Sequence, residues 1–427
     1  MHEMLNQALA SARPFAQRLF KQLAEGTGDP LGGVSRPSYG QGEQFAHDLL
    51  AHEAAGMGLE VARDAALNTY MTLPGTDRGG PRIVIGSHLD SVAQGGNYDG
   101  AAGVVAGLTA LSVLRSCGIA PTFGLTVMGI RAEESAWFQT SYIGSRAALG
   151  LLTPEALDAC RVDTGLSLAE HIRALGGQPE HLSQGRGFLN PAELLAYVEV
   201  HIEQAPSLVH AGNVLGVGTG IPGNFRYPEI CVSGVTAHVG LPRRFRHDAL
   251  LAAVDFVAEM DAVWKRWEAA GRSMAFTVGR FHTDPSQDAM TKVPGLTRFS
   301  LDVRAYDEHD LLELQAEMDR IVADIKAQRG VTFSCGIRTT APVAKVDQAI
   351  AQEFFQIARA QKISVQELPS PASHDAAVFC SAGVPMGLLL MRNENGSHNP
   401  DERLELDDFM AAVDVLVRWL AVRAPGA

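Results

Sequence analysis

One strand–helix–strand pattern in the first third of the chain restricts the fold more than any other feature. A short apolar run, Arg82–Ser87, is followed by a helix of small apolar residues, Ala101–Leu114, and by a second apolar run, Leu125–Arg131. Buried strands that alternate with helices indicate a mostly parallel sheet covered on both faces. Ligands of such sheets bind beyond the C-terminal strand ends, where His88 and the pair Glu133-Glu134 fall.

The pattern changes near Leu215. The elements expected after this point are the strands Tyr227–Ser233, Ala275–Arg280 and Leu296–Arg304 and the helices Asp248–Ala269 and Asp310–Gln328. They form a compact α+β group, whereas both flanking segments have the α/β pattern. Because 427 residues exceed one ordinary core, we predict an inserted domain, residues 215–336, within a larger domain, residues 1–214 and 337–427.

Composition excludes several classes of protein. The net charge of −13 argues against nucleic acid or an anionic membrane as partner. The longest apolar runs, such as Leu125–Ile130 and Met386–Met391, are too short to cross a bilayer, and the N-terminus lacks the apolar core of a signal peptide. Five cysteines without CxxC spacing suit a reducing compartment and exclude a cysteine zinc site. We therefore expect a cytoplasmic protein.

Five short segments place metal-binding side chains where a glycine or a strand end exposes them. They are GSHLDS (86–91), NYDGAAG (97–103), RAEES (131–135), HIEQ (201–204) and GSHNPDE (396–402). Imidazole and carboxylate groups together suit zinc, manganese, cobalt or nickel. Two such ions about 3.5–4 Å apart need a bridging carboxylate. Three imidazoles and two carboxylates would form a balanced set for that purpose.

Each segment alone has a simpler interpretation. A histidine at a strand end is ordinarily a satisfied polar residue, and Glu133-Glu134 alone is more often a solvated acidic pair. Asp99 before Gly100, like Asn399-Pro400, also indicates a turn. The order and the setting of the five segments, taken together, favour a metal site.

These segments carry a family resemblance. GSHLDSV, GGNYDGAAGVVAGL, EES, HIEQ, SHDA and GSHNPDE, in this order, resemble the hydantoinase/carbamoylase branch of the M20 metallopeptidase superfamily. That branch includes N-carbamoyl-L-amino acid hydrolases, allantoate amidohydrolases and β-ureidopropionases. The resemblance implies a zinc-peptidase-like α/β catalytic domain with an inserted α+β dimerisation, or lid, domain, and hence a homodimer. It also implies two divalent metal ions per subunit.

The resemblance assigns the metal ligands residue by residue. His88 and His201 would bind one ion, Glu134 and His398 would bind the other, and Asp99 would bridge both. A bridging water, made acidic by both cations, would be the nucleophile.

Other positions match catalytic and substrate-binding residues. Glu133 matches the general base, Asp90 the residue that orients an imidazole, and His238 the donor that steadies the oxyanion. The residues expected to contact substrate are Arg304, Asn224, Thr291 and His374. Two alternatives stay open: Arg304 could be an ion-paired strand residue, and which subunit supplies His238 is undecided.

The chain departs from the family around the substrate and not at the metals. Thr291 stands where the family commonly has a substrate-contacting asparagine, and Trp137 follows the acidic pair where an arginine is usual. Ala205 replaces a glycine, and the run after His238 is altered. Hydrolase chemistry is therefore expected to be intact, with a different or more apolar acyl or amine portion in the substrate.

The sequence thus predicts a binuclear-metal amidohydrolase that cleaves a linear amide or ureido bond of a small, carboxylated molecule. An aminoacylase- or dipeptidase-like M20 hydrolase is the alternative within the superfamily. A binding or regulatory protein that has lost catalysis is the alternative from another class. Such a protein is expected to have lost a metal ligand or the general base, but the ligand set and the base are both present in this sequence.

Overall fold

The computed structural model describes residues 2–423 and divides into two compact units. The first unit runs up to Ile221 and resumes at Lys345, and the second is Pro222–Ala344. Between residues 2 and 423, none of the helices combines the length and the apolar character that a bilayer crossing requires. Each unit has its own buried core.

Strand pairing explains where the chain passes from one unit to the other. β6 (Leu215–Gly218) pairs with β17 (Val365–Leu368) and β18 (Met386–Met391), so residues 215–218 belong to the first unit. β15 (Thr339–Ala341) pairs with β8 (Gly223–Ser233), which extends the second unit beyond residue 336. Both points lie a few residues later than the sequence pattern places them.

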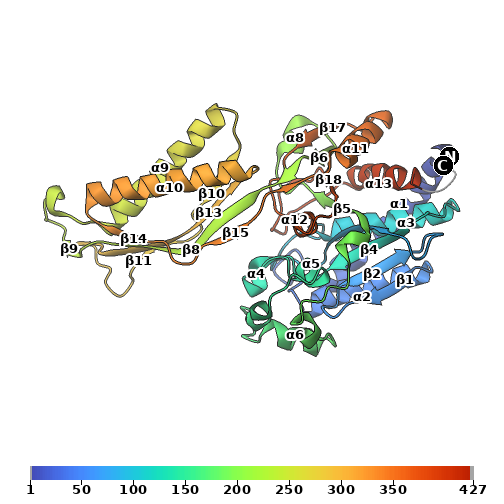
Figure 1. Cartoon of the computed structure of the whole chain (residues 1–427), viewed down its shortest axis with the longest axis horizontal. Helices are drawn as coiled ribbons and strands as arrows, with labels where there is room; N and C mark the ends of the chain where they lie inside the picture. Colours follow the sequence, from blue (N-terminus) through green and yellow to red (C-terminus); the bar gives the residue numbers. More distant parts are fainter. Residues whose placement is uncertain (1, 424–427) are drawn as a thin grey trace. The chain divides into compact units, whose positions relative to one another are not determined.

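The first unit is built on an eight-stranded sheet with the order β1-β2-β4-β3-β5-β18-β6-β17 (Figure 1). Its remaining strands are β1 (Glu60–Arg63), β2 (Thr69–Leu73), β3 (Arg82–His88), β4 (Gly124–Ile130) and β5 (Leu194–Ile202). The central strands β4, β3, β5 and β18 are parallel neighbours, as predicted. The sheet is nevertheless mixed, because β1, β2 and β4 pair antiparallel and β6 runs against β18.

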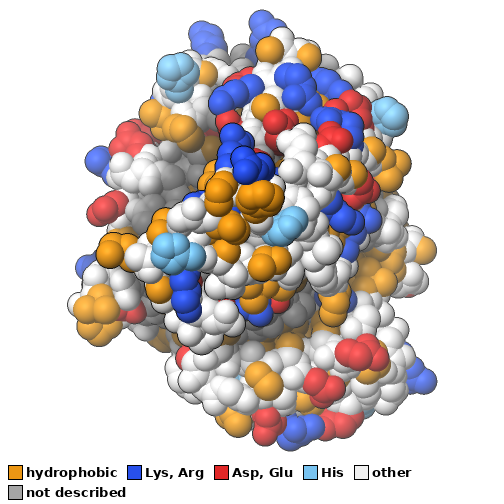
Figure 2. Space-filling view, turned by 90° about the vertical axis from the view of Figure 1, so that its left-hand side faces the viewer, with side chains coloured by type: hydrophobic (Ala, Val, Ile, Leu, Met, Phe, Trp, Pro, Cys, Tyr) orange, Lys and Arg blue, Asp and Glu red, His pale blue; other side chains and the backbone are white. Residues whose placement is uncertain are grey.

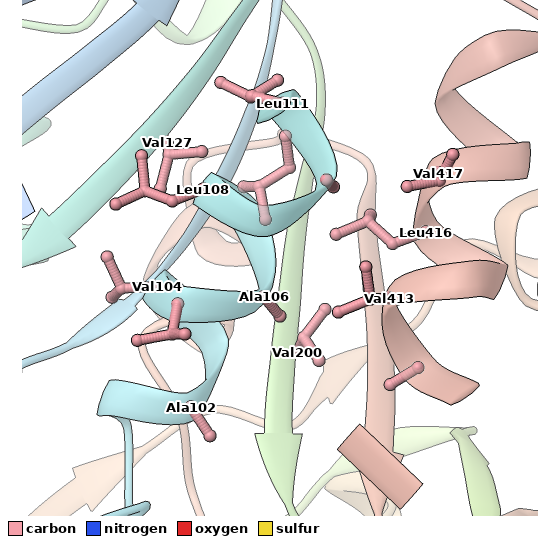
Figure 3. Packing of buried hydrophobic residues seen from close by; sticks show 14 of the residues in the cluster. Ala102, Val104, Ala106, Leu108, Leu111, Val127, Val200, Val413, Leu416 and Val417 are labelled. Atoms are coloured by element: carbon pink, nitrogen blue, oxygen red, sulfur yellow. The ribbon is translucent and has the colours of Figure 1, made fainter. Parts of the chain in front are cut away.

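Helices cover this sheet, and α3 occupies the centre of the core. The helices of the unit are α1 (His2–Thr27), α2 (Gln41–Gly56), α3 (Ala101–Ser116), α4 (Ser135–Phe138), α5 (Ile143–Ala148), α6 (Leu168–Ala174), α7 (Pro179–Leu182), α8 (Ser207–Ala211), α11 (Gln348–Ala360), α12 (Ala376–Ser381) and α13 (Leu406–Ala421). Val104 and Leu108 of α3 pack in the same apolar cluster as Val127 and Val200 of the sheet (Figure 3). Gly103 permits this approach, because a Cβ there would lie 2.1 Å from the carbonyl oxygen of Val200.

The second unit is an antiparallel sheet with two long helices packed against it. Its elements are β8, β9 (Ala237–His238), β10 (Met274–Thr277), β11 (Phe281–Thr283), β12 (Lys292–Val293), β13 (Leu296–Ala305), β14 (Thr332–Ser334), β15, α9 (Ala249–Ala269) and α10 (Glu308–Arg329). Side chains of β13 alternate between half-buried and buried. The buried ones, such as Val303, pack with Phe225 of β8, Phe256 of α9 and Leu314 of α10. This alternation is what a sheet with one covered face requires.

Candidate metal centre

Four parallel strands bring the sequence-predicted metal ligands to one edge of the sheet. His88 is the last residue of β3, Glu134 follows β4, His201 lies near the end of β5, and His398 lies in the segment after β18. Asp99 lies in the turn that precedes α3. Because parallel strands end on the same side of a sheet, segments more than 300 residues apart in sequence meet there.

The first group of ligand atoms comes from three buried side chains, His88, Asp99 and His201. The Oδ1 atom of Asp99 lies 3.4 Å from the Nε2 atom of His88 and 3.3 Å from that of His201. The two Nε2 atoms are 3.4 Å apart. Two imidazole nitrogens and one carboxylate oxygen at such separations fit around a single divalent cation.

The second group shares the same aspartate. The Nε2 atom of His398 lies 3.3 Å from the Oδ2 atom of Asp99 and 3.0 Å from the Oε1 atom of Glu134. Asp99 thus turns one oxygen towards each group of ligands. A carboxylate in that position is suited to bridge two cations.

Electrostatics at the centre favour positive charge. Burial opposes the ionisation of Asp99, but contacts with His201, His398 and His88 hold the pKa of its carboxyl well below the usual range. Hydrogen bonding to Asp99 and then to Glu134 raises the pKa of His398 to about 11. The buried carboxylates therefore attract cations to the positions that the histidines line.

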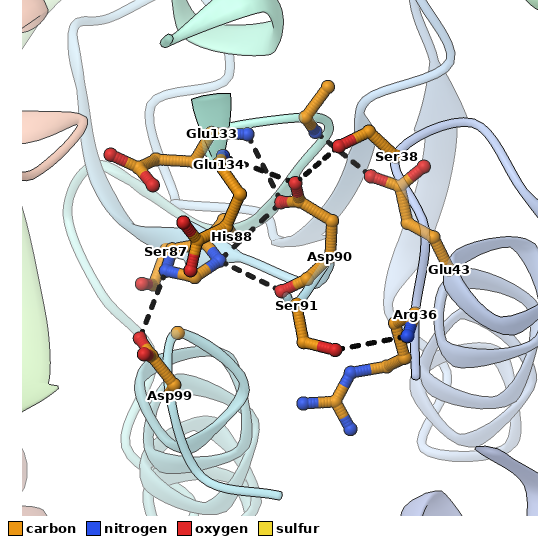
Figure 4. A network of polar contacts seen from close by, with 12 residues as sticks. Arg36, Ser38, Glu43, Ser87, His88, Asp90, Ser91, Asp99, Glu133 and Glu134 are labelled. Atoms are coloured by element: carbon orange, nitrogen blue, oxygen red, sulfur yellow. Dashed lines mark hydrogen bonds and ion pairs between the residues drawn. The ribbon is translucent and has the colours of Figure 1, made fainter. Parts of the chain in front are cut away.

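Asp90 fixes two parts of the centre at once (Figure 4). The Nδ1 atom of His88 lies 3.1 Å from the carbonyl oxygen of Asp90 and 3.5 Å from its Oδ1 atom. The Asp90 carboxylate also accepts the backbone N–H groups of Glu133 and Glu134, each at 3.1 Å. Ser38 donates its hydroxyl to Asp90 at 2.6 Å. One buried side chain thereby positions both an imidazole and the acidic pair.

Glu133 is buried beside the centre. Desolvation raises the pKa of its carboxyl well above the usual value; His88 opposes this shift, and the nearby Glu134, Asp375 and Asp90 add to it. Its side chain leaves the same turn as that of Glu134 (Figure 4). A carboxyl group that holds a proton more readily than usual can accept one from water near neutral pH.

His374 is also brought to this edge, next to His201. Their ring centroids are 4.5 Å apart. The Nε2 atom of His374 lies 2.8 Å from the hydroxyl oxygen of Ser370. Burial, followed by the proximity of His201, lowers the pKa of His374 well below its usual value.

Four other sequence-predicted residues lie in the second unit, where they form two neighbouring pairs. On β9, the exposed His238 is followed by Val239, whose N–H donates to the carbonyl oxygen of Thr291 at 2.9 Å. Arg304 of β13 is the cross-strand partner of the buried Asn224 on β8. Figure 2 shows basic and hydrophobic side chains intermixed on one face of the molecule.

Arg304 also contacts a carboxylate of its own strand. Its Nε and Nη2 atoms lie 3.2 and 3.1 Å from the two carboxylate oxygens of Asp302, which also accepts from Arg226. Arg304 is therefore an ion-paired residue of a strand, as the alternative interpretation of the sequence expects. The Arg304 side chain remains 31% exposed.

Known proteins resemble this chain in sequence and in fold. A family model described as peptidase family M20/M25/M40 matches residues 84–422. The chain belongs to peptidase family M20. An N-carbamoyl-L-amino acid amidohydrolase of Geobacillus stearothermophilus is 33% identical to this M20 chain over 421 residues, 96% of this chain and 98% of the relative. An allantoate amidohydrolase of Bacillus subtilis is 29% identical over 376 residues, 87% of this chain and 88% of the relative.

Solved structures agree with this assignment. A hydantoinase/carbamoylase family amidase from Burkholderia ambifaria superposes with a TM-score of 0.83 at 26% identity, covering 97% of this chain and 98% of that chain. The aminopeptidase PepT of Bacillus cereus, at 16% identity and a TM-score of 0.63, shares the fold alone. The M20 chain is a hydrolase of the hydantoinase/carbamoylase branch, whose named members act on carbon–nitrogen bonds other than peptide bonds.

Three residues that the sequence analysis did not predict position Asp99 in the candidate metal centre. Gln204 and Ser397 donate to the Oδ2 atom of Asp99 at 2.9 and 2.5 Å. Glu402 accepts the backbone N–H groups of Tyr98 and Asp99 at 2.8 and 3.2 Å. The HIEQ segment contains Gln204, and the GSHNPDE segment contains Ser397 and Glu402. Their closeness in sequence to the candidate ligands His201 and His398 is the sequence feature that could have identified them.

Trp137 has a structural contact in this M20 chain. Its indole N–H donates to the carbonyl oxygen of Ser91 at 2.8 Å, and its ring is half-buried against the cluster that contains Tyr39 and Phe138. The side chain therefore joins the segment after the acidic pair to the segment after His88.

Proposed function

We propose that this chain is a binuclear-metal amidohydrolase that cleaves a linear amide or ureido bond of a small, carboxylated substrate such as an N-carbamoyl amino acid. One observation carries the proposal: Asp99 belongs to both groups of metal-binding side chains and offers a different oxygen to each. The similar proteins named as amidohydrolases of N-carbamoyl-L-amino acids and allantoate support the substrate class.

The residues present fit two divalent cations. His88 and His201 would hold one, Glu134 and His398 the other, and Asp99 would bridge both. When bound, such ions supply Lewis-acid activation of water and of the scissile carbonyl. The Oδ1 atom of Asp99, buried and without a hydrogen-bond partner in residues 2–423, is consistent with a cation at this position.

Glu133 would carry the protons of the reaction. Its carboxylate takes a proton from the attacking water as the oxygen bonds to the carbonyl carbon. It then delivers that proton to the leaving nitrogen as the carbon–nitrogen bond breaks. The raised pKa of Glu133, caused mainly by burial, supports a base that works near neutral pH. The backbone bonds from Glu133 and Glu134 to Asp90 fix the turn from which it acts.

We assign substrate contacts to the second unit, as a dimerisation and lid domain. His238 would donate a hydrogen bond to the developing oxyanion. Arg304, next to Asn224, would place the substrate carboxylate through its planar guanidinium. Thr291 beside His238 is the remaining proposed contact of the second unit, and His374 beside His201 is a proposed contact of the first unit.

We further propose that the protein is a homodimer. The second unit has an open apolar groove lined by Val254, Val257 and Ala258 of α9 with Phe276 and Phe281 of the sheet. Val254 is 46% and Phe281 38% exposed. Exposed apolar surface of this kind commonly marks an interface, and a second copy of the chain would cover it. Sedimentation of the wild type and of Val254→Asp tests this, with a shift to monomer expected in the variant.

Metal analysis combined with a substrate panel tests the function. The panel compares N-carbamoyl amino acids with N-acyl amino acids, dipeptides and simple amides. We expect about two metal ions per subunit and the highest kcat/KM on a ureido substrate. Higher kcat/KM on N-acyl amino acids would favour the aminoacylase-like alternative. That alternative is included because Thr291 and Trp137 differ from the residues that the family commonly has near the substrate. A metal-loaded protein that hydrolyses none of these compounds would contradict the proposal.

A further inference from the structure

The turn that carries Glu133 has an unusual backbone. It lies between β4, which ends at Ile130, and α4, which begins at Ser135. Within it Ala132 is fully buried and has a φ of 51°. This left-handed conformation is unfavourable for a residue with a Cβ atom, so the surroundings must hold it in place.

Buried side chains accept the N–H groups of this turn, whereas its carbonyl groups accept backbone N–H groups at the start of α5, such as that of Ile143 to Ala132 at 3.0 Å. Its four N–H groups donate as follows: Arg131 to Asn68, Ala132 to Glu43, and both Glu133 and Glu134 to Asp90. The Ala132 N–H lies 2.9 Å from the Oε1 atom of Glu43. Figure 4 shows the carboxyl groups of Glu43 and Asp90 directed towards the turn. The left-handed residue thus has one side-chain acceptor, Glu43.

The Glu43 carboxylate is itself fixed by charge. Its Oε2 atom accepts from the Nη1 atom of Arg131 at 2.8 Å and from the N–H of Tyr39 at 2.6 Å. Both side chains of this ion pair are fully buried. The guanidinium also donates to Gln44 and to the carbonyl oxygen of Leu67. A buried charge with this many partners has one favoured position.

We propose that Glu43 is a positioning residue for Glu133. By accepting the Ala132 N–H, it keeps Ala132 in the left-handed conformation that orients Glu133 beside Glu134. Glu43 touches neither the candidate metal ligands nor the reacting atoms, and it acts through the Ala132 N–H and the Arg131 side chain of the turn. The inference rests on the proposed role of Glu133 as the base.

Replacement of Glu43 by its amide is the first test. In Glu43→Gln, Arg131 and the Tyr39 N–H compete for the single carbonyl oxygen, so the amide nitrogen is left to face the Ala132 N–H. We expect kcat to fall about 10- to 100-fold, because a displaced base is misaligned with its proton. KM should stay within about threefold of the wild-type value, with full metal content.

A second substitution separates positioning from stability. Glycine adopts positive φ without a steric penalty, so Ala132→Gly in the Glu43→Gln background should recover most of the lost kcat. A purely structural role for Glu43 predicts no such rescue. The matched control is Asp408→Asn, the same acid-to-amide change at a buried carboxylate paired with Arg392 at 2.8 Å. It should lower thermal stability and leave kcat unchanged.

The results separate this inference from the proposed function. A kcat for Glu43→Gln within about twofold of the wild type, or an absence of rescue by Ala132→Gly, would overturn the positioning role. If Glu43→Gln does not fold, Glu43→Asp carries the same test, because it retains the charge for Arg131 and is too short to reach Ala132. Failure of the proposed function would look different: full activity in Glu133→Gln, or none in the wild type.

Discussion

The Oδ1 atom of Asp99 lies 3.4 Å from the Nε2 atom of His88 and accepts no hydrogen bond from any residue between 2 and 423. A buried carboxylate oxygen without a donor is costly, and its other neighbour, His201, presents a second ring nitrogen at 3.3 Å. A divalent cation among these three atoms would supply the partner that the Asp99 oxygen lacks. The most direct predictions therefore concern metal binding.

Asp99→Asn should remove the shared ligand. We expect the metal content to fall from about two ions per subunit to one or fewer, and kcat/KM to fall at least about 100-fold, because both sites lose an anionic donor. Elemental analysis and kinetics after chelation and metal replacement provide the measurement. Asp407→Asn, at an 81% exposed side chain, is the control and should match the wild type. Full metal content in Asp99→Asn would rule out a bridging role.

Glu133→Gln should separate catalysis from metal binding. Without a carboxylate to accept the water proton, kcat should fall about 10²- to 10⁴-fold, while metal content and thermal unfolding stay unchanged. Steady-state kinetics with metal analysis on the same preparations make the comparison. Glu193→Gln, at a half-exposed surface glutamate, controls for the loss of one negative charge. A variant that keeps its metals and turns over normally would remove Glu133 as the base.

The two ends of α3 offer a matched pair of glycines. Gly100 has a φ of 65°, and a Cβ there would lie 2.5 Å from the His88 ring; Gly118 has a φ of 66° and nothing within 4 Å. Alanine at Gly118 should cost about 1 kcal/mol of folding stability because its φ is positive, and alanine at Gly100, which also has a positive φ, should cost more because of the clash with His88. Only Gly100→Ala should also lose metal and activity, since it displaces His88. Equal metal content in the two variants would contradict this.

The pH dependence of stability should report on Glu43. Burial raises the pKa of its carboxyl from the usual 4.5 to about 6, although Arg131 opposes the shift. Between these values the folded protein binds more protons than the unfolded chain, so this contribution is complete below about pH 4.5 and is lost as the pH rises through 6.

The change amounts to about 2 kcal/mol. It is measured as the free energy of unfolding in urea of metal-free wild type minus that of metal-free Glu43→Gln. This difference should decrease from pH 4.5 to pH 6.5 and then level off. A difference that is flat, or that increases with pH, would show that Glu43 is ionised throughout this range.

Arg304→Lys should affect substrate affinity selectively. Lysine keeps the charge but lacks the two parallel donors that match a carboxylate. We expect KM for a carboxylated substrate to rise about tenfold or more, and kinetics on an uncharged amide to stay unchanged. Arg298→Lys, on the same strand and 3.7 Å from Glu229, is the control. An equal loss on both substrates would assign Arg304 to the structure of the sheet.

Much of the framework could be predicted from local sequence. The runs around β3 and β4 are apolar enough to require burial, and α3 between them is made of small residues that allow close packing. His88 and Glu134 lie at one edge of the sheet because β3 and β4 are parallel and end on the same side. The resemblance to the M20 family supplied the order of the remaining ligands.

Two elements depend on packing against other segments. The N-terminal helix α1 spans His2–Thr27, and its Leu5 and Leu9 are buried in the large core. The central sheet is mixed because the hairpin of β1 and β2 adds antiparallel strands at its edge. The place of a helix in the core, or of a hairpin in the sheet, depends on the segments that pack against it.

By itself, the sequence determined the chemical type of each candidate ligand and the place of His88 and Glu134 at strand ends, because side-chain chemistry and apolar periodicity are properties of neighbouring residues. Only the tertiary structure decided which buried carboxylate receives which backbone N–H: Glu43 the Ala132 N–H, Asp90 that of Glu133, and Glu402 that of Asp99. These contacts join segments 43 to 303 positions apart. Whether such groups meet depends on how the helices and strands between them pack.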